Sequence, residues 1–451
     1  MRHRPLSLTA ALLVLAFPGA GPAAESPASD LPTPVAATRP ELKDQLERSK
    51  QAHPRLPLPP PSAEELAAAK ARAGRGPMSG IINNGRMRRL YLPAELLGGG
   101  FSREPDPTMT LDNTFKTMFF WIVSRANNCT YCQGHQEVKL AGDGVREETI
   151  AALDGDWSEF TPAQRAAFAF TLKLTRAPNQ IGDADLDRLR AHYTDLQILE
   201  IIMAVGGFNA MNRWTGPLAI PQEGHRVFLT PTPEKYRALR SRVAPLPAAG
   251  SAAAPVCAQP ADRGPLENPA QVAAALAACR KRAPRLPLAS DEQARGVVPA
   301  DWSGSGPLPQ WVRLLANFPK GGRAWVAQTW HAETKGRLSS QLKAEIAYVA
   351  ARHDRAWYAL GQAQRRLKDL GLSDPAIDGL DHPGDAVPEA ERAALALARK
   401  LTVDPALITD ADIAALRRHY PDPEVAEIVY HVTQAAFFDR LTEAAGLRLE
   451  P

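Results

Sequence analysis

The sequence has little net charge and only one long apolar run. Its 53 Lys and Arg residues nearly balance 49 Asp and Glu residues, leaving a net charge of +4 over 451 residues. The basic residues are scattered rather than grouped in a stripe, which argues against a nucleic-acid-binding surface. No second long apolar segment follows the N-terminal one, which argues against a protein that crosses a membrane several times.

Cysteine is also scarce, with four residues in two local pairs. The first pair, Cys129 and Cys132, is followed by Gln133, so the Cys-x-x-Cys-His signature of haem attachment is absent. Zinc held by Cys129, Cys132 and His135 would need a fourth ligand, and the chain lacks the second Cys/His knuckle that usually supplies it. We therefore expect no metal and no cofactor other than a redox-active disulfide.

The chemistry is concentrated between Ser124 and Gln136, where two thiols and an imidazole lie within seven residues. Apolar residues precede this stretch and helix formers follow it, so we expect Cys129, Cys132 and His135 on one face of a helix. Thiols three residues apart can close a disulfide, and a helix N-terminus stabilises a thiolate. This pattern favours redox chemistry, in which one thiol attacks and the other resolves. A purely structural disulfide is the alternative.

The run Asn-Asn-Cys-x-Tyr-Cys, followed by His and preceded by an apolar helix, resembles the alkylhydroperoxidase D-like and carboxymuconolactone decarboxylase superfamily. The resemblance implies an all-α fold, peroxidase or disulfide reductase activity, and assembly into oligomers. It also implies that Cys132 attacks the peroxide, that Cys129 resolves the product and that His135 relays the proton. Two positions depart from the family pattern: the usual His position holds Gln136, and the usual relay Glu falls on Thr117.

The N-terminus has the three-part plan of a secretory signal peptide. A basic start is followed by an apolar run over residues 6–17 and by small residues over 19–24. We expect residues 1–24 to be a cleaved signal peptide and the protein to be exported to the periplasm or secreted, with no membrane span after cleavage. An uncleaved N-terminal anchor is the alternative. Residues 25–40, rich in Ala, Pro, Ser and Thr, are expected to be disordered or extended.

The second half of the chain repeats the first at a constant offset. Leu174-Thr175 recurs as Leu401-Thr402, Asp183-Ala-Asp as Asp410-Ala-Asp, His192-Tyr193 as His419-Tyr420 and Glu200-Ile201 as Glu427-Ile428. We therefore expect two copies of one helical domain, at 41–242 and 270–451, joined by a Pro/Ala-rich linker over 243–269. Helices are expected over 41–50, from Ser62 to about residue 74, from Thr161 to Leu174, over 183–193 and over 196–208.

The same offset places Ala356, Ala359 and Gln362 at the positions of the first cysteine, the second cysteine and the histidine. The second copy therefore keeps the scaffold without the redox groups. We expect it to cover the active helix as the other half of an internal pseudo-dimer, with homo-oligomers as a further expectation. Binding of a small molecule or a partner protein is the alternative for this copy.

The sequence thus predicts a thiol-dependent peroxidase that acts on a small hydroperoxide and takes electrons from an unidentified thiol reductant. Candidate pocket residues are Trp121, Tyr131, Trp214 and His225. Cys257 and Cys279 are a candidate structural disulfide. Thiol-disulfide exchange on other proteins is an alternative activity. The alternative from a different functional class is a non-catalytic helical binding or assembly module in which the Cys pair is only structural.

Overall fold

The computed structural model describes residues 31–72, 80–98, 106–247, 258, 263–303, 306–384 and 387–451. Within these ranges the chain is helical and has no β-strand, apart from one isolated backbone bridge between Thr38 and Arg240. The predicted all-α class is confirmed. The predicted signal peptide, residues 25–30 and Cys257 lie outside the described residues, and the linker over 243–269 is described only in part.

The helices follow one another with short connections. The α-helices are α1 Arg39–Ser49, α2 Ala63–Arg72, α3 Asn83–Tyr91, α4 Asn113–Ala126, α5 Thr130–Gly142, α6 Glu147–Ala152, α7 Pro162–Arg176, α8 Asp183–Arg190, α9 Asp195–Thr215, α10 Glu234–Arg237, α11 Pro269–Cys279, α12 Asp291–Arg295, α13 Gln310–Leu315, α14 Gly321–Thr334, α15 Ser340–Asp354, α16 Trp357–Asp369, α17 Asp374–Asp378, α18 Glu389–Val403, α19 Asp410–Arg417 and α20 Asp422–Ala444. The 3-10 helices are η1 Ala94–Leu96, η2 Pro178–Gln180, η3 Val227–Leu229, η4 Gly379–Asp381 and η5 Pro405–Leu407.

Capping residues fix the starts of several predicted helices. Ser62 accepts from the backbone N–H of Glu65 at 3.1 Å, and the Glu65 carboxylate accepts from the Ser62 N–H at 2.9 Å. Thr161 and Thr194 form capping boxes at α7 and α9 in the same way. Each box satisfies two N–H groups that the first turn of a helix leaves free. The predicted starts of α2 and α7 are therefore confirmed.

The helix α9 runs seven residues past its predicted end at Phe208. Its last turns carry Asn209, Asn212 and Arg213, which read as polar in the sequence but are fully buried. Asn209 and Asn212 both accept from the side-chain amide of Asn127 on the α4–α5 corner, at 3.1 and 3.0 Å. Tertiary hydrogen bonds therefore replace the apolar stripe on which the prediction relied.

The chain packs against the helices before residue 41, the predicted start of the first domain. Val35 is buried, and the carbonyl of Ala36 accepts from the Arg125 guanidinium at 2.9 Å. Arg39 is buried as well and forms a two-pronged ion pair with Glu137. The last part of the segment predicted to be disordered or extended is therefore packed against the helices.

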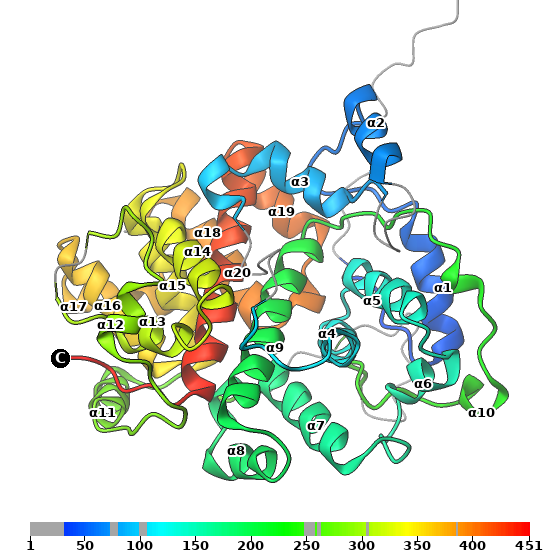
Figure 1. Cartoon of the computed structure of the whole chain (residues 1–451). Coiled ribbons are helices and arrows are strands. Elements are labelled where there is room, and N and C mark those ends of the chain that lie inside the picture. Colours follow the sequence, from blue (N-terminus) through cyan, green and yellow to red (C-terminus); the bar gives the residue numbers. More distant parts are fainter. Residues whose placement is uncertain are drawn as a thin grey trace, which may run out of the picture.

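Two helical groups lie on either side of a central pair, α9 and α20 (Figure 1). Helices α4–α8 gather beside α9, and α11–α18 gather around α20. The two central helices approach closely, because a Cβ atom on Gly206 of α9 would lie 3.2 Å from the Phe437 ring of α20. The longest buried helices of the two halves thus form the middle of one molecule.

Helix bounds recur between the halves at the offset that relates Leu174 to Leu401. The bounds of α5, α7, α8 and η2 coincide at this offset with those of α16, α18, α19 and η5. An ion pair recurs too, since Arg125–Asp154 at 3.0 Å has its counterpart in Arg352–Asp381 at 2.7 Å. These elements and this ion pair therefore occupy equivalent positions in the two halves, while the origin of the halves as copies of one domain stays a prediction.

Contacts between the halves are made in both directions. Arg213 of α9 donates to the carbonyl of Thr402 at 2.9 Å, and Arg440 of α20 donates to the carbonyl of Thr175 at 3.1 Å. At the offset that relates Leu174 to Leu401, Arg213 corresponds to Arg440 and Thr175 to Thr402. The two contacts are therefore equivalent, with the roles of the halves exchanged. Such reciprocity is typical of an isologous interface.

A second pair of contacts between the halves involves Arg55, in the segment between α1 and α2, and Arg285, in the segment between α11 and α12. Arg55 pairs with Asp410 at 2.6 Å, and Arg285 pairs with Asp183 at 2.6 Å. Each half therefore places an arginine on an aspartate of the other half. In the part of the chain that the structure describes, no helix is both long enough and apolar enough to cross a membrane.

Candidate redox site

The turn between α4 and α5 places both thiols at the start of a helix. Asn128 has a positive φ of 49°, a backbone region that Asn tolerates better than most residues, and Cys129 is the N-cap of α5. The N–H of Cys129 donates back to the carbonyl of Ser124 at 2.9 Å, which tightens this corner. Cys132 follows in the first turn of α5.

One hydroxyl bridges the two sulfur atoms. Thr215, the last residue of α9, places Oγ1 3.1 Å from Cys129 Sγ and 3.0 Å from Cys132 Sγ. Both cysteines are free thiols, and their exposed fractions are only 3% and 2%. The pair is thus buried and held by a polar group at the end of a neighbouring helix.

The two thiols differ in their electrostatics. Burial raises the pKa of Cys129, but hydrogen bonds from Cys132, Thr215 and the backbone N–H groups at the start of α5 outweigh it and lower that pKa. Burial, together with the hydrogen bond to Cys129 and the charge on that residue, raises the pKa of Cys132 well above its ordinary value. Cys129 is therefore the thiol that ionises first.

A cavity of about 260 Å³ lies beside the pair. The residues lining it include Asn127, Thr130, Tyr131, Thr215 and Gly216 from the first half and Pro405, Ala406 and Ile408 from the second. A Cβ atom on Gly216 would lie 3.9 Å from Cys129 Sγ, which places the cavity wall against that sulfur. Thr215 lines the cavity and contacts both sulfur atoms, whereas neither cysteine is among the described residues that line it.

Comparison with known proteins gives weak similarities. No family model matches the chain. The uncharacterized protein YdfG of Bacillus subtilis (strain 168) is 24% identical over 108 residues, which cover 23% of this chain and 73% of YdfG.

Two solved structures of the debrominase Bmp8 are also similar. The apo form is 20% identical with a TM-score of 0.32, covering 35% of this chain and 86% of that chain. A cysteine variant in complex with 2,3,4-tribromopyrrole is 21% identical with a TM-score of 0.30, covering 32% and 78%. Similarities this weak establish neither the fold nor the activity of this chain.

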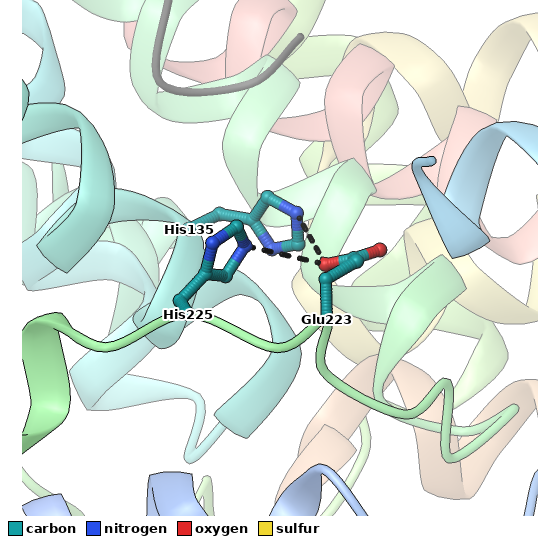
Figure 2. Close-up of side chains that lie close together, drawn as sticks. All are labelled: His135, Glu223 and His225. Atoms are coloured by element: carbon teal, nitrogen blue, oxygen red, sulfur yellow. Dashed lines mark ion pairs between the residues drawn. The ribbon is translucent and has the colours of Figure 1, made fainter. Parts of the chain in front are cut away.

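His135 lies on α5 with the cysteines but makes its contacts elsewhere. Its Nδ1 lies 2.8 Å from the carbonyl oxygen of Tyr131, and its Nε2 lies 3.1 Å from Glu223 Oε2. His225 approaches the same carboxylate oxygen at 3.6 Å (Figure 2). The structure therefore joins two of the predicted residues, His135 and His225, around Glu223 rather than around the thiols.

The remaining predicted pocket residues divide into two kinds. Tyr131 lines the cavity and donates its hydroxyl to Glu223 at 2.9 Å. Trp121 and Trp214 are fully buried, donate to Glu137 at 2.7 Å and to Asn84 at 2.8 Å, and are not among the described residues that line the cavity. The two tryptophans are core residues of the first half.

Thr117 and Glu137 also occupy structural positions. The Thr117 hydroxyl donates to the carbonyl of Asn113 at 2.8 Å within α4. Glu137, the nearest carboxylate in sequence, is buried between Arg39 and Trp121. In the described contacts, neither residue takes the place of the family's relay carboxylate.

The sequence did not single out Thr215 and Glu223, which the structure places at the centre of the two clusters. The repeat contained a signal for both, because Thr442 and Glu450 occupy the corresponding positions of the second half. Neither residue lies near the cysteines in sequence. Only the packing of α9 and the loop that follows it against α5 brings them there.

The second half has its own cavity of about 270 Å³. Ala359, His431 and Asp439 are among its lining residues, and Ala356, at the position of Cys129, is buried. Cys279 is a buried free thiol whose Sγ lies 3.6 Å from the carbonyl of Leu447. Since Cys257 lies outside the described residues, the pairing of these two cysteines stays a prediction.

Proposed function

We propose that the chain is a thiol-dependent oxidoreductase that reduces a small hydroperoxide through a disulfide between Cys129 and Cys132. The observation that carries this proposal is the asymmetric thiol pair. One thiol has a lowered pKa and the other a raised one, and both share the hydroxyl of Thr215 beside a cavity. A purely structural disulfide needs no such difference in pKa, whereas an attacking thiol and its resolving partner need one.

Burial of the pair favours a small substrate over a protein disulfide. Thiol-disulfide exchange requires the attacking sulfur to reach a sulfur of the partner in line, which is hindered when both thiols are almost fully buried. The adjacent cavity of about 260 Å³ is large enough for an organic hydroperoxide. The electron donor that reduces the disulfide is, for the same reason, a small thiol in this proposal.

The environment of the thiols favours Cys129 as the attacking group, the reverse of the order that the family resemblance implies. The Cys129 thiolate attacks the outer peroxide oxygen, the O–O bond breaks, and the alkoxide leaves and is protonated to an alcohol. The thiol of Cys132 then attacks the Cys129 sulfenic acid, forming the disulfide and releasing water. Two molecules of the reducing thiol restore both cysteines and leave as their own disulfide.

We propose further that the two halves are copies of one domain and form an internal pseudo-dimer. The coinciding helix bounds and the reciprocal Arg213 and Arg440 contacts support this arrangement. In it, the second half contributes Pro405, Ala406 and Ile408 to the wall of the first half's cavity. The degenerate copy then acts as a cover for the thiol site.

The test is a stoichiometric reaction with peroxide. The full chain is reduced, freed of reductant, treated with one equivalent of cumene hydroperoxide and mapped for disulfides by mass spectrometry. We expect one peroxide consumed for each Cys129–Cys132 disulfide formed. Cys129→Ser should consume no peroxide, while Cys132→Ser should consume it and accumulate a sulfenic acid at Cys129.

The control chain carries Cys257→Ser and Cys279→Ser, which removes the second cysteine pair whether or not it is bonded, and it should react as the wild type does. If the wild-type pair stays reduced while peroxide persists, the peroxidase proposal is wrong and a structural role replaces it. A sulfenic acid at Cys132 in Cys129→Ser would instead restore the order implied by the resemblance.

A further inference from the structure

Three donor atoms from two separate elements meet beside the first turn of α5. His135 comes from α5, and Glu223 and His225 come from the loop that follows α9 (Figure 2). Their Nε2 and carboxylate oxygen atoms all lie within 4.8 Å of one another. Ligand atoms around a tetrahedral ion with bonds of 2.0–2.2 Å are about 3.3–3.6 Å apart, close to the 3.1 and 3.6 Å measured to Glu223 Oε2.

The hydrogen bonds around the cluster leave these atoms free. A carbonyl oxygen can only accept, so the contact between His135 Nδ1 and Tyr131 O places the proton on Nδ1 and the lone pair of the neutral ring on Nε2. The other carboxylate oxygen, Glu223 Oε1, accepts from Tyr131 Oη at 2.9 Å and from the Asn83 N–H at 2.7 Å. Such outer contacts are typical of metal ligands.

The three inward-facing atoms lack a hydrogen bond of acceptable geometry to any described residue. His135 is 93% buried, with an exposed fraction of 7%, so this lack is costly. Burial would raise the pKa of Glu223, but the neighbouring imidazoles of His135 and His225 hold it below its usual range. The orientation of the two imidazoles at Glu223 Oε2, however, suits an ion bound between the ligand atoms better than an N–H group that donates to this oxygen.

The second half contains the same arrangement of a tyrosine hydroxyl, a backbone N–H and a glutamate, here called the frame, without the imidazoles. Glu450 accepts from Tyr358 Oη at 2.9 Å and from the Gln310 N–H at 2.7 Å, as Glu223 does from Tyr131 and Asn83. At the position of His135, Gln362 donates its amide to Glu450 Oε2 at 2.8 Å. A simple amide donor therefore satisfies the frame. The imidazole of His135 therefore exceeds what the frame requires.

We infer that His135 Nε2, His225 Nε2 and a Glu223 oxygen form a binding site for a divalent first-row transition ion of the zinc class. Two imidazoles and one carboxylate match the ligand types that such ions prefer, and three protein ligands leave a fourth position open. The side chains of Glu223 and His225 are partly exposed, so the ion can enter from that side. This site is independent of the thiol chemistry proposed above.

The test uses Co²⁺ as the probe on the full chain carrying Cys129→Ser and Cys132→Ser, so that no thiol of the redox site can bind it. After removal of metal by a chelator, we expect one equivalent of Co²⁺ to give the intense visible bands of a four-coordinate site. Zn²⁺ should displace it. Tyr131→Phe, which removes a hydrogen bond to Glu223, should weaken binding by about 10–100-fold.

The matched control is His135→Gln, because Gln362 shows that an amide fits this frame. It should keep the thermal stability of the parent while losing stoichiometric Co²⁺ binding, and His225→Gln should lose it too. The inference is overturned if the parent binds no stoichiometric Co²⁺, which would leave an imidazolium–carboxylate cluster. It is equally overturned if binding survives in both histidine variants. The outcome of the peroxide experiment affects neither result.

Discussion

At the scale of single residues, Thr215 has the largest influence on the thiol pair. It ends α9, its hydroxyl also donates to the carbonyl of Met211 at 3.1 Å, and its Oγ1 touches both sulfur atoms. When Cys129 is a thiolate, the single proton of this hydroxyl turns from the Met211 carbonyl to the sulfur, so the hydroxyl donates to Cys129 instead. A hydrogen bond to a charged group contributes about 1.5–3 kcal/mol, which corresponds to about one to two pKa units.

The substitution Thr215→Val removes this hydroxyl and keeps the shape of the side chain. The pKa of Cys129 is lowered in part by Thr215, so the variant should raise it by about one unit or more. At a pH below this pKa, the thiolate fraction and the rate of alkylation should fall about tenfold. The measurement is the alkylation rate of Cys129 as a function of pH, in chains that carry Cys132→Ser. An unmoved profile would show that Thr215 does not stabilise the thiolate.

At the scale of elements, α5 depends on close contact with the loop after α9. Gln222 of that loop donates its amide to the carbonyls of Thr130 and Tyr131, at 2.8 and 2.7 Å. It can do so because Gly134 has no side chain, since a Cβ there would lie 2.1 Å from Gln222 Nε2 and 2.8 Å from the Phe228 ring. The glycine therefore sets how closely the loop approaches the cysteine helix.

Gly134→Ala should destabilise the protein, although alanine is the better helix former. Overpacking of a buried contact costs about 1–3 kcal/mol, against a gain of up to about 1 kcal/mol in helix propensity. The control is Gly85→Ala in α3, where a Cβ meets only Arg89 Nη1 at an ordinary 3.4 Å and the gain should dominate. Urea unfolding of both variants measures the difference. A stabilised Gly134→Ala would mean that Gln222 moves aside at no cost.

At the scale of the whole molecule, α9 and α20 join the two halves through buried contacts. Arg213 and Arg440 are fully buried, and each satisfies a carbonyl of the opposite half. Burial and the charge of Arg440 lower the pKa of Arg213 well below its ordinary value. Separating the halves would expose both central helices, so neither half is expected to unfold alone.

The halves should therefore unfold in one cooperative transition. Buried free thiols report on each half: Cys129 and Cys132 on the first and Cys279 on the second. In a chain carrying Cys257→Ser, all three should become reactive toward a thiol reagent at the same temperature, within roughly 4 °C. Two transitions, with Cys279 exposed well before or after the others, would mean that the α9–α20 contact does not couple the halves.

The sequence by itself determined the helical class, several helix starts and the position of the cysteine pair. Capping boxes such as Thr161–Gln164 and the three-residue spacing of Cys129 and Cys132 are local, and local hydrogen bonds and helix geometry decide their outcome. The constant offset of the repeat also predicted the register in which the helix bounds of the two halves coincide.

The tertiary structure alone decided which side chains meet the helix face that carries Cys132 and His135. Thr215 reaches the thiols and Glu223 reaches the His135 imidazole only because α9 and its following loop pack against α5. Such partners lie some eighty to ninety residues away, where periodicity and capping carry no information. Polar contacts over that separation depend on the packing of whole helices, which the sequence expresses only through the fold.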